Sequence, residues 1–207
     1  MRAKVVIFLA VLFLTGSLSC GLFATRDPVQ PSGSQFPCLT LSSPDNVVTN
    51  ILQAYGQTDG LGCYVSTLAD FVSTTEPGFR FHPDPTDSSE APAGQYDSWT
   101  KTVEERVAEN IANSARRDSF RLTFKLPYET ITSQPDLVIR RYTYEMRFND
   151  SATPPAITDS LFQGLAEISI RRAGGVWQIT DWVDRRDPGG TTTLTWGYLR
   201  GSYRTGF

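Results

Sequence analysis

The spacing of apolar residues changes partway along the chain, and this change constrains the fold more than any other feature. Residues 42–59 carry Val47, Ile51 and Tyr55 at helical spacing, and two later segments repeat that pattern. After residue 118, apolar residues alternate with polar ones, which is typical of strands. Helices followed by long strands predict an α+β domain. We expect the helices on one face of a curved antiparallel sheet of about four to six strands.

The expected helices have recognisable first turns. Ser43 can cap the first helix, with Pro44 at its first helical position. Thr102 and Glu105 form a capping-box pattern for the third helix. The three helices are expected at residues 42–59, 61–71 and 97–117.

Four alternating segments predict the main strands. A glycine-containing turn at 173–175 joins the last two, and the apolar set changes parity within 178–182, which indicates a bulge. A short strand is expected at 78–83, and the tail at 191–204 is expected as a short helix or a last strand. The main strands are expected at 119–126, 137–148, 162–172 and 175–185.

The N-terminus has the pattern of an export signal that ends at a cysteine. Arg2 and Lys4 precede an apolar run that is shorter than the roughly 20 residues a spanning helix needs. Residues 17–20, SLSC, resemble the lipobox of bacterial lipoproteins, although Ser17 stands where an apolar residue is usual. We expect cleavage just before Cys20 and acylation of that cysteine. The alternative is ordinary secretion with a plain thiol at Cys20.

Lipidation would anchor the chain in the bacterial cell envelope without spanning the membrane. Gly21 follows the cysteine, where an aspartate would signal retention in the inner membrane of some bacteria. We therefore expect the protein to be anchored in the outer membrane and to face the periplasm or the cell surface. The expected organisation is a lipoprotein signal peptide at 1–19, a lipidated tether at 20–42 and one α+β domain at 43–207.

Two further cysteines, Cys38 and Cys63, allow two interpretations. The compartment outside the inner membrane is oxidising, so the pair can form a disulfide. The alternative is two separately buried thiols, since free cysteine packs well in apolar surroundings. One histidine and no closely spaced cysteine pair cannot make a zinc site, so we expect no metal and no cofactor.

The charge of the chain argues against a nucleic-acid partner. Removal of the signal peptide takes Arg2 and Lys4 away, which leaves 17 of the 19 basic residues against 22 acidic ones and a formal net charge of −5. Binding to nucleic acid requires a basic face, which this composition does not favour.

Several stretches resemble the nuclear-transport-factor-two-like (cystatin-like) cone fold. NVVTNILQAY, YVSTLADF and FRF are similar to its opening helices and first strand, and residues 162–185 are similar to its last hairpin, whose second strand carries W-x-I. The resemblance covers residues 44–184, and the chain also looks like bacterial lipoproteins of this shape. It implies a cone with a pocket between the concave face of the sheet and the helices. Some members are enzymes similar to ketosteroid isomerase and scytalone dehydratase and many only bind, so the fold leaves the function open.

His82, the single histidine, is a weak catalytic candidate. A general base needs a positioned partner, and the nearest carboxylates are those of Asp84 and Asp87 in the polar segment 82–95. We expect that segment to be a solvated loop and His82 to be a surface residue. Asp70 matches the D-F pair of the resembling fold, which implies a capping or structural role.

Asp181 and Asp184 are the other weak catalytic candidates. Depending on where the bulge falls, one of them points into the cone. An apolar wall would raise its pKa and allow it to move protons. The alternative is a pair of charges on the solvated face beside Arg185 and Arg186.

Aromatic residues of the strands supply both the expected core and a candidate pocket. Large rings dominate core burial, and a subset that faces the helices would line an apolar ligand site. The pocket candidates are Tyr142, Tyr144, Phe148, Trp177 and Trp182.

These observations favour a membrane-anchored, non-catalytic binding or interaction module. The sequence lacks the several pocket carboxylates, or the His–Asp pair, that the resemblance leads us to expect of an enzyme. The expected partners are the membrane, through the lipid, and a small apolar ligand or an envelope protein. One alternative is a small cofactor-independent lyase or isomerase of the cone fold, and another is a purely structural envelope lipoprotein.

Overall fold

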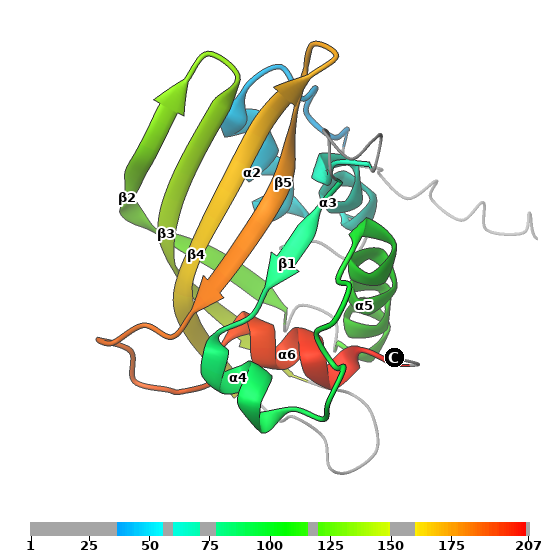
Figure 1. The fold of residues 1–207 in the computed structure, drawn as a ribbon, viewed down its shortest axis with the longest axis vertical. Coiled ribbons are helices and arrows are strands. Elements are labelled where there is room, and N and C mark those ends of the chain that lie inside the picture. The colour runs from blue at the N-terminus through cyan, green and yellow to red at the C-terminus, as the bar shows by residue number, and fades with distance from the viewer. Residues whose placement is uncertain (1–36, 56–59, 71–77, 116–119, 150–159, 206–207) are drawn as a thin grey trace, which may run out of the picture. The chain divides into compact units, whose positions relative to one another are not determined.

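In the computed structural model, five strands form one mixed sheet that packs against helices (Figure 1). The structure describes residues 37–55, 60–70, 78–115, 120–149 and 160–205. The strands are β1 (Arg80–His82), β2 (Arg121–Gln134), β3 (Leu137–Phe148), β4 (Ser160–Ala173) and β5 (Val176–Arg185). The helices are α2 (Pro44–Ala54), α3 (Leu61–Thr67), α4 (Pro85–Glu90), α5 (Lys101–Ser114) and α6 (Trp196–Tyr203).

The strand order is β1-β5-β4-β3-β2, which confirms the expected α+β class. The pairs β2–β3, β3–β4 and β4–β5 are antiparallel, as expected, and the three-residue β1 adds a parallel edge beside β5. Strand β2 continues eight residues beyond the expected end at Leu126, to Gln134. The sheet is therefore a long antiparallel meander with one short parallel strand at its edge.

A bulge in β5 decides which residues of the last hairpin face the helices. Ile170 of β4 pairs with Ile179, whereas the preceding Ser169 pairs with Asp181, so Thr180 is the extra residue. This confirms the bulge that the parity change predicts. Beyond it, the inward face of β5 carries Trp182, which has no exposed surface.

The inner face of the sheet and the apolar faces of the helices form the core. Val47 and Ile51 of α2 and Val107 and Ile111 of α5 are buried, as their helical spacing predicts. The largest buried side chains of the sheet are aromatic, and they dominate the burial. They include Phe124, Tyr142, Tyr144, Phe148, Phe162, Trp177 and Trp182.

The two expected helix starts have different outcomes. The Ser43 hydroxyl accepts a hydrogen bond from the backbone N–H of Asn46 at 3.2 Å, which confirms the cap of α2. The predicted Thr102–Glu105 capping box is wrong, because α5 already begins at Lys101 with Thr100 as its N-cap. The tail forms helix α6, one of the two structures expected for it.

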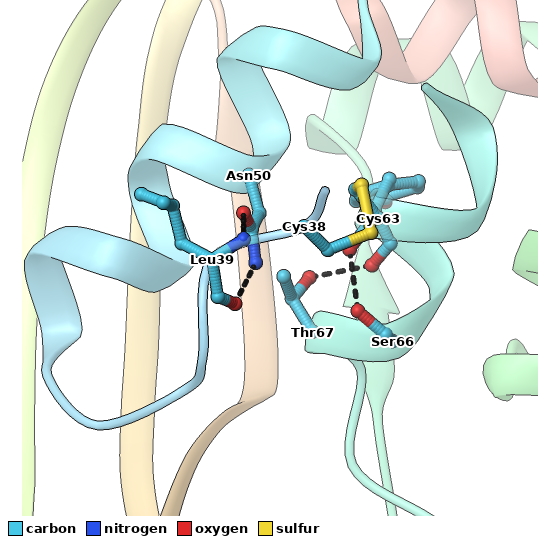
Figure 2. The surroundings of a disulfide bond; sticks show 7 residues. Cys38, Leu39, Asn50, Cys63, Ser66 and Thr67 are labelled. Atoms are coloured by element: carbon cyan, nitrogen blue, oxygen red, sulfur yellow. Dashed lines mark hydrogen bonds between the residues drawn. A yellow bond between two sulfur atoms is a disulfide. The ribbon is translucent and has the colours of Figure 1, made fainter. Parts of the chain in front are cut away.

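A disulfide joins Cys38 to Cys63 of α3, which is one of the two interpretations that the sequence left open (Figure 2). Beside it, the Asn50 side chain accepts a hydrogen bond from the Leu39 N–H at 2.8 Å and donates one to the Leu39 carbonyl at 2.9 Å. The Trp177 N–H also donates to the carbonyl of Leu41 at 2.8 Å. The end of the expected tether is thus tied to the folded unit.

The signal peptide, Cys20 and the tether up to residue 36 lie outside the described residues. Within the ranges that the structure describes, no helix has both the length and the apolar character needed to cross a bilayer.

Candidate functional site

Helix α6 occupies the space between the inner face of the sheet and the helices, which we call the cone interior. Its residues Trp196, Leu199 and Arg200 have no exposed surface. The Trp196 ring lies 4.5 Å from that of Trp182 and 4.9 Å from that of Tyr55, measured between ring centroids. Among the described residues, the segment that follows the last strand therefore packs buried side chains into the cone interior.

The five pocket candidates are all buried, and they lie in different parts of the core. Tyr144 and Trp182 contact α6 directly through Trp196. Tyr142 stacks on Phe124, with ring centroids 4.6 Å apart. Phe148 packs edge-on against Phe120 and Tyr203, and Trp177 is buried near the turn between β4 and β5.

Asp184 is the aspartate of the last hairpin that faces the cone interior. Its side chain is fully buried, and its Oδ2 accepts a hydrogen bond from the backbone N–H of Gly197 at 2.5 Å. Burial raises the pKa of Asp184 to about 7, against the lowering effect of the Gly197 N–H and of Arg200. Asp184 therefore has the pKa expected of a proton-transfer group, but it binds the first turn of α6.

The Tyr144 hydroxyl holds the same turn of α6. It accepts a hydrogen bond from the Trp196 N–H at 2.6 Å, and it also interacts with Asp184. Gly164, which pairs with Tyr144 on the neighbouring strand, makes room for this hydroxyl. A Cβ atom at Gly164 would lie 2.5 Å from the Tyr144 Oη, so a side chain there would displace the hydroxyl from α6.

Arg200 lies at the centre of the cone interior and forms an ion pair with a buried glutamate. Its Nε is 2.9 Å from Oε1 of Glu104, and its Nη2 donates to the Tyr64 hydroxyl at 2.9 Å. The Tyr64 hydroxyl donates in turn to Oε1 of Glu104 at 2.6 Å, and the Trp99 indole N–H donates to Oε2 at 2.7 Å. Glu104 is thus satisfied from three directions.

Aromatic rings surround the Arg200 guanidinium. Its Cζ lies 4.3 Å from the ring centroid of Phe81, 4.6 Å from that of Trp182 and 4.4 Å from that of Trp196, which is cation–π distance. Burial on its own would lower the pKa of Arg200, but the Glu104 carboxylate raises it above its usual value. Arg200 is therefore a permanent positive charge in a cage of rings.

The arrangement in the cone interior resembles a ligand bound in a pocket. A cation sits between aromatic faces, its carboxylate partner is hydrogen-bonded, and an aspartate and a tyrosine hold adjacent backbone N–H groups. The bound group, however, belongs to the chain itself. Asp184 and Tyr144 have no exposed surface, and both accept hydrogen bonds from backbone N–H groups of α6.

His82 of β1 and Asp181 of β5 lie on the outer face of the sheet, whereas Asp184 faces the cone interior. The His82 Nε2 is 3.5 Å from Oδ1 of Asp181, and the His82 side chain is 50% exposed. The interaction with His82 lowers the pKa of Asp181. The partner of His82 is thus neither Asp84 nor Asp87, and the pair is exposed to solvent.

We expect a His82→Ala substitution to change the free energy of unfolding by less than about 1 kcal/mol, because polar contacts between exposed side chains contribute little. Urea unfolding of the two proteins measures this difference. Asp181→Asn serves as the matched control, since it removes the other half of the pair. A loss of several kcal/mol would contradict the surface role of His82.

The expectation of a solvated loop at 82–95 is wrong for its two aspartates. Residues 85–90 form helix α4, and both Asp84 and Asp87 are buried. Asp84 caps α4 by accepting from the Thr86 N–H at 2.8 Å, and Asp87 is 2.9 Å from Nη2 of Arg186. The local cause is a capping aspartate before a proline, a pattern that starts helices.

Asp70, the residue that matches the D-F pair, forms an exposed ion pair with Lys101 at 2.9 Å. Its carboxylate therefore lies at the start of α5 and outside the cone interior.

Within the described ranges, no group of three histidine, cysteine, aspartate or glutamate side chains is arranged to hold a metal ion.

A half-open groove of about 410 Å³ lies between α4 and α6 on the outside of the cone. We call it the α4–α6 groove and define it by Glu90, Pro92, Tyr96, Tyr198, Gly201 and Arg204. Tyr198 is 41% exposed, although it is one of the large hydrophobic residues. The volume is in the range of small-molecule sites.

Two residues of the cone interior, Glu104 and Arg200, were missed by the reasoning from sequence. Glu104 precedes Val107, Ala108 and Ile111 at helical spacing, so it lies on the apolar face of its helix. Arg200 follows Trp196 by four positions. An acidic residue, Glu104, lies on the apolar face of one helix, and a basic residue, Arg200, lies on the apolar face of another. This pattern in the sequence could have predicted a buried ion pair.

Comparisons with known proteins bear on the fold. No protein-family model matches the sequence, and no curated protein matches it. Among solved structures, a provisionally assigned scytalone dehydratase from Novosphingobium aromaticivorans DSM 12444 is similar with a TM-score of 0.51 and 7% identity, over 74% of this chain and 90% of that one. The chain has the NTF2-like cone fold.

Two further structures are similar at lower scores. An NTF2-like superfamily protein from Salmonella enterica has a TM-score of 0.47 and 8% identity, over 70% of this chain and 90% of that one. A provisionally assigned aromatic ring hydroxylase from Novosphingobium aromaticivorans has a TM-score of 0.49 and 8% identity, over 69% of this chain and 85% of that one. At identities this low, the reactions of these proteins are not carried over to this chain.

Proposed function

We propose that this chain is a non-catalytic binding or interaction module of the bacterial cell envelope, held at the outer membrane by a lipid on Cys20. One observation supports the proposal that the module is non-catalytic. The cone interior, where a member of this fold would hold a substrate, is filled by Trp196, Leu199 and Arg200 of the chain's own helix α6. Binding is then a property of the outer surface.

The α4–α6 groove supports binding over a purely structural role. A structural lipoprotein needs a closed core, which the filled cone supplies, but it does not need a groove of about 410 Å³ with an exposed tyrosine in its wall. Exposed aromatic side chains in concave surfaces are typical of contact sites.

A cone-fold lyase or isomerase is the second candidate, and Asp184 favours it. A buried carboxyl group with a pKa of about 7 beside a tyrosine hydroxyl suits acid–base chemistry. Against it, both groups bind backbone N–H groups of α6. Failure of a folded Asp184→Asn protein to complement a deletion strain would favour the enzyme.

A Cys20→Ser substitution tests the anchor. We expect the variant to lose labelling by radioactive palmitate and to move from the membrane fraction to the soluble fraction, because the acyl chains are its hold on the bilayer. Ser34→Ala, in the same expected tether, is the control and should stay in the membrane. Retention of unlabelled Cys20→Ser protein in the membrane fraction would contradict the lipoprotein proposal.

A further inference from the structure

We propose that the α4–α6 groove binds a small organic cation, an alkyl- or arylammonium group, on the outside of the cone. This inference rests on the proposed binding function and adds the chemical class of the ligand. Four features of the groove carry it: an excess of carboxylates, aromatic walls, two helix C-termini and a fixed floor.

The carboxylates beside the groove outnumber the cations that pair with them. Asp84, Asp87 and Glu90 share the single guanidinium of Arg186, at 3.8 Å, 2.9 Å and 3.4 Å. Asp87 and Glu90 line the groove, but the Asp87 side chain is fully buried, so Glu90, which is 61% exposed, is the carboxylate that a ligand can contact. Among the described residues around the groove, these three carboxylates stand against two guanidinium groups, those of Arg186 and Arg204, which leaves a net negative charge that an incoming cation would neutralise.

The walls and the helix ends favour a cation with an apolar surface. Tyr96, Tyr198 and Pro92 line the groove, and aromatic rings attract ammonium groups through their faces. Helix α4 ends at Glu90 and α6 ends at Tyr203, so both C-terminal ends border the groove. The carbonyl groups at a helix C-terminus carry partial negative charge and attract cations.

Arg204, the cation that lines the groove, is held by other groups. Its Nη1 donates to the backbone carbonyl of Gln95 at 2.6 Å, and its Cζ lies 5.2 Å from the ring centroid of Trp99. Arg204 therefore supports the wall formed by Gln95, and Glu90 pairs with Arg186.

The floor of the groove is fixed by hydrogen bonds between α6 and the segment after α4. The Tyr96 hydroxyl donates to the Gly197 carbonyl at 2.9 Å, and the Gln95 side-chain amide donates to the Gly201 carbonyl. Gly201 is needed for this approach, because a Cβ atom there would lie 2.2 Å from the Tyr96 Oη. A pre-formed site loses little entropy when it binds a small ligand.

Calorimetric titration of the full-length protein, in a non-ionic detergent, tests the proposal with choline as the probe. Its neutral isostere 3,3-dimethylbutan-1-ol is the matched ligand control. We expect choline to bind saturably and the alcohol to bind at least about tenfold more weakly, because the positive charge is the recognised feature. Glu90→Gln and Tyr198→Ala should each weaken choline binding about threefold to tenfold. Glu109→Gln, which removes one exposed charge from α5, should leave it unchanged.

Each outcome decides the proposal. Absence of choline binding, equal binding of the neutral alcohol, or unchanged binding by both groove variants would overturn it. The groove variants carry substitutions at exposed side chains, and circular dichroism of each confirms that it is folded. Failure here leaves the Cys20→Ser fractionation unaffected, so the ligand class and the anchored binding module are tested separately.

Discussion

An Arg200→Met substitution is expected to lower the free energy of unfolding by about 3–5 kcal/mol. Methionine keeps much of the volume of arginine but removes the charge. Glu104 would then be left in the cone interior, fully buried and without its cation. An unpaired buried carboxylate costs far more than the loss of an exposed ion pair. Urea unfolding followed by tryptophan fluorescence measures the difference.

Two further variants isolate the ion pair. Arg106→Met removes an exposed arginine from α5 and should change the free energy of unfolding by less than about 0.5 kcal/mol. In the double variant Arg200→Met/Glu104→Gln, much of the lost stability should return, because no buried charge remains. If Arg200→Met is as stable as the original protein, Arg200 does not fill the cone interior in solution.

The second large effect is a dependence of stability on pH that comes from Asp184. Its pKa is raised by burial to about 7 in the folded protein, whereas an aspartate in an unfolded chain titrates near 4. Between these values the folded state binds more protons than the unfolded state. The contribution of Asp184 to stability is therefore fully present below about pH 4 and is lost as the pH rises through 7, by an amount on the order of 4 kcal/mol.

The groups that face Asp184 set the size of this effect. Arg200 and the Gly197 N–H favour the charged carboxylate, and Asp87 disfavours it. We expect the unfolding free energy of the unmodified protein to increase from pH 8 to pH 5 relative to that of Asp184→Asn, in parallel urea titrations. Asp181→Asn is the matched control, because the pKa of Asp181 is lowered and its effect appears only below about pH 4. A constant difference between the protein and Asp184→Asn across this range would rule out a raised pKa at Asp184.

The order of the elements and the faces of the main strands could be predicted from the sequence because they depend on local periodicity. Tyr142, Tyr144, Met146 and Phe148 alternate along one strand and are all buried. The parity change after Gln178 placed the bulge, and the bulge decides that Asp184, and not Asp181, faces inward. A two-residue period is strict enough for such inferences.

The contents of the cone interior could not be predicted, because they depend on contacts between distant parts of the chain. The Arg200–Glu104 pair joins residues of α6 and α5, and the Asp87–Thr195 hydrogen bond joins α4 to the cap of α6. Asp84 and Asp87 look like loop residues in a polar stretch until Arg186 is brought beside them. A local pattern can mark a charged side chain on an apolar helix face, as at Glu104, but it does not show which distant residue will be its partner.

Hydrogen exchange at α6 tests most directly whether this helix closes the cone. The amide protons of Trp196 and Gly197 donate to Tyr144 and Asp184, so they can exchange only when α6 leaves the cone interior. We expect native-state hydrogen exchange, measured by NMR, to give both amides an opening free energy equal to that of global unfolding. The amides of the central strand β4 should give the same value. Exchange of Trp196 and Gly197 at a free energy several kcal/mol lower, with β4 still protected, would contradict a permanently filled cone and reopen Asp184 and Tyr144 as an active site.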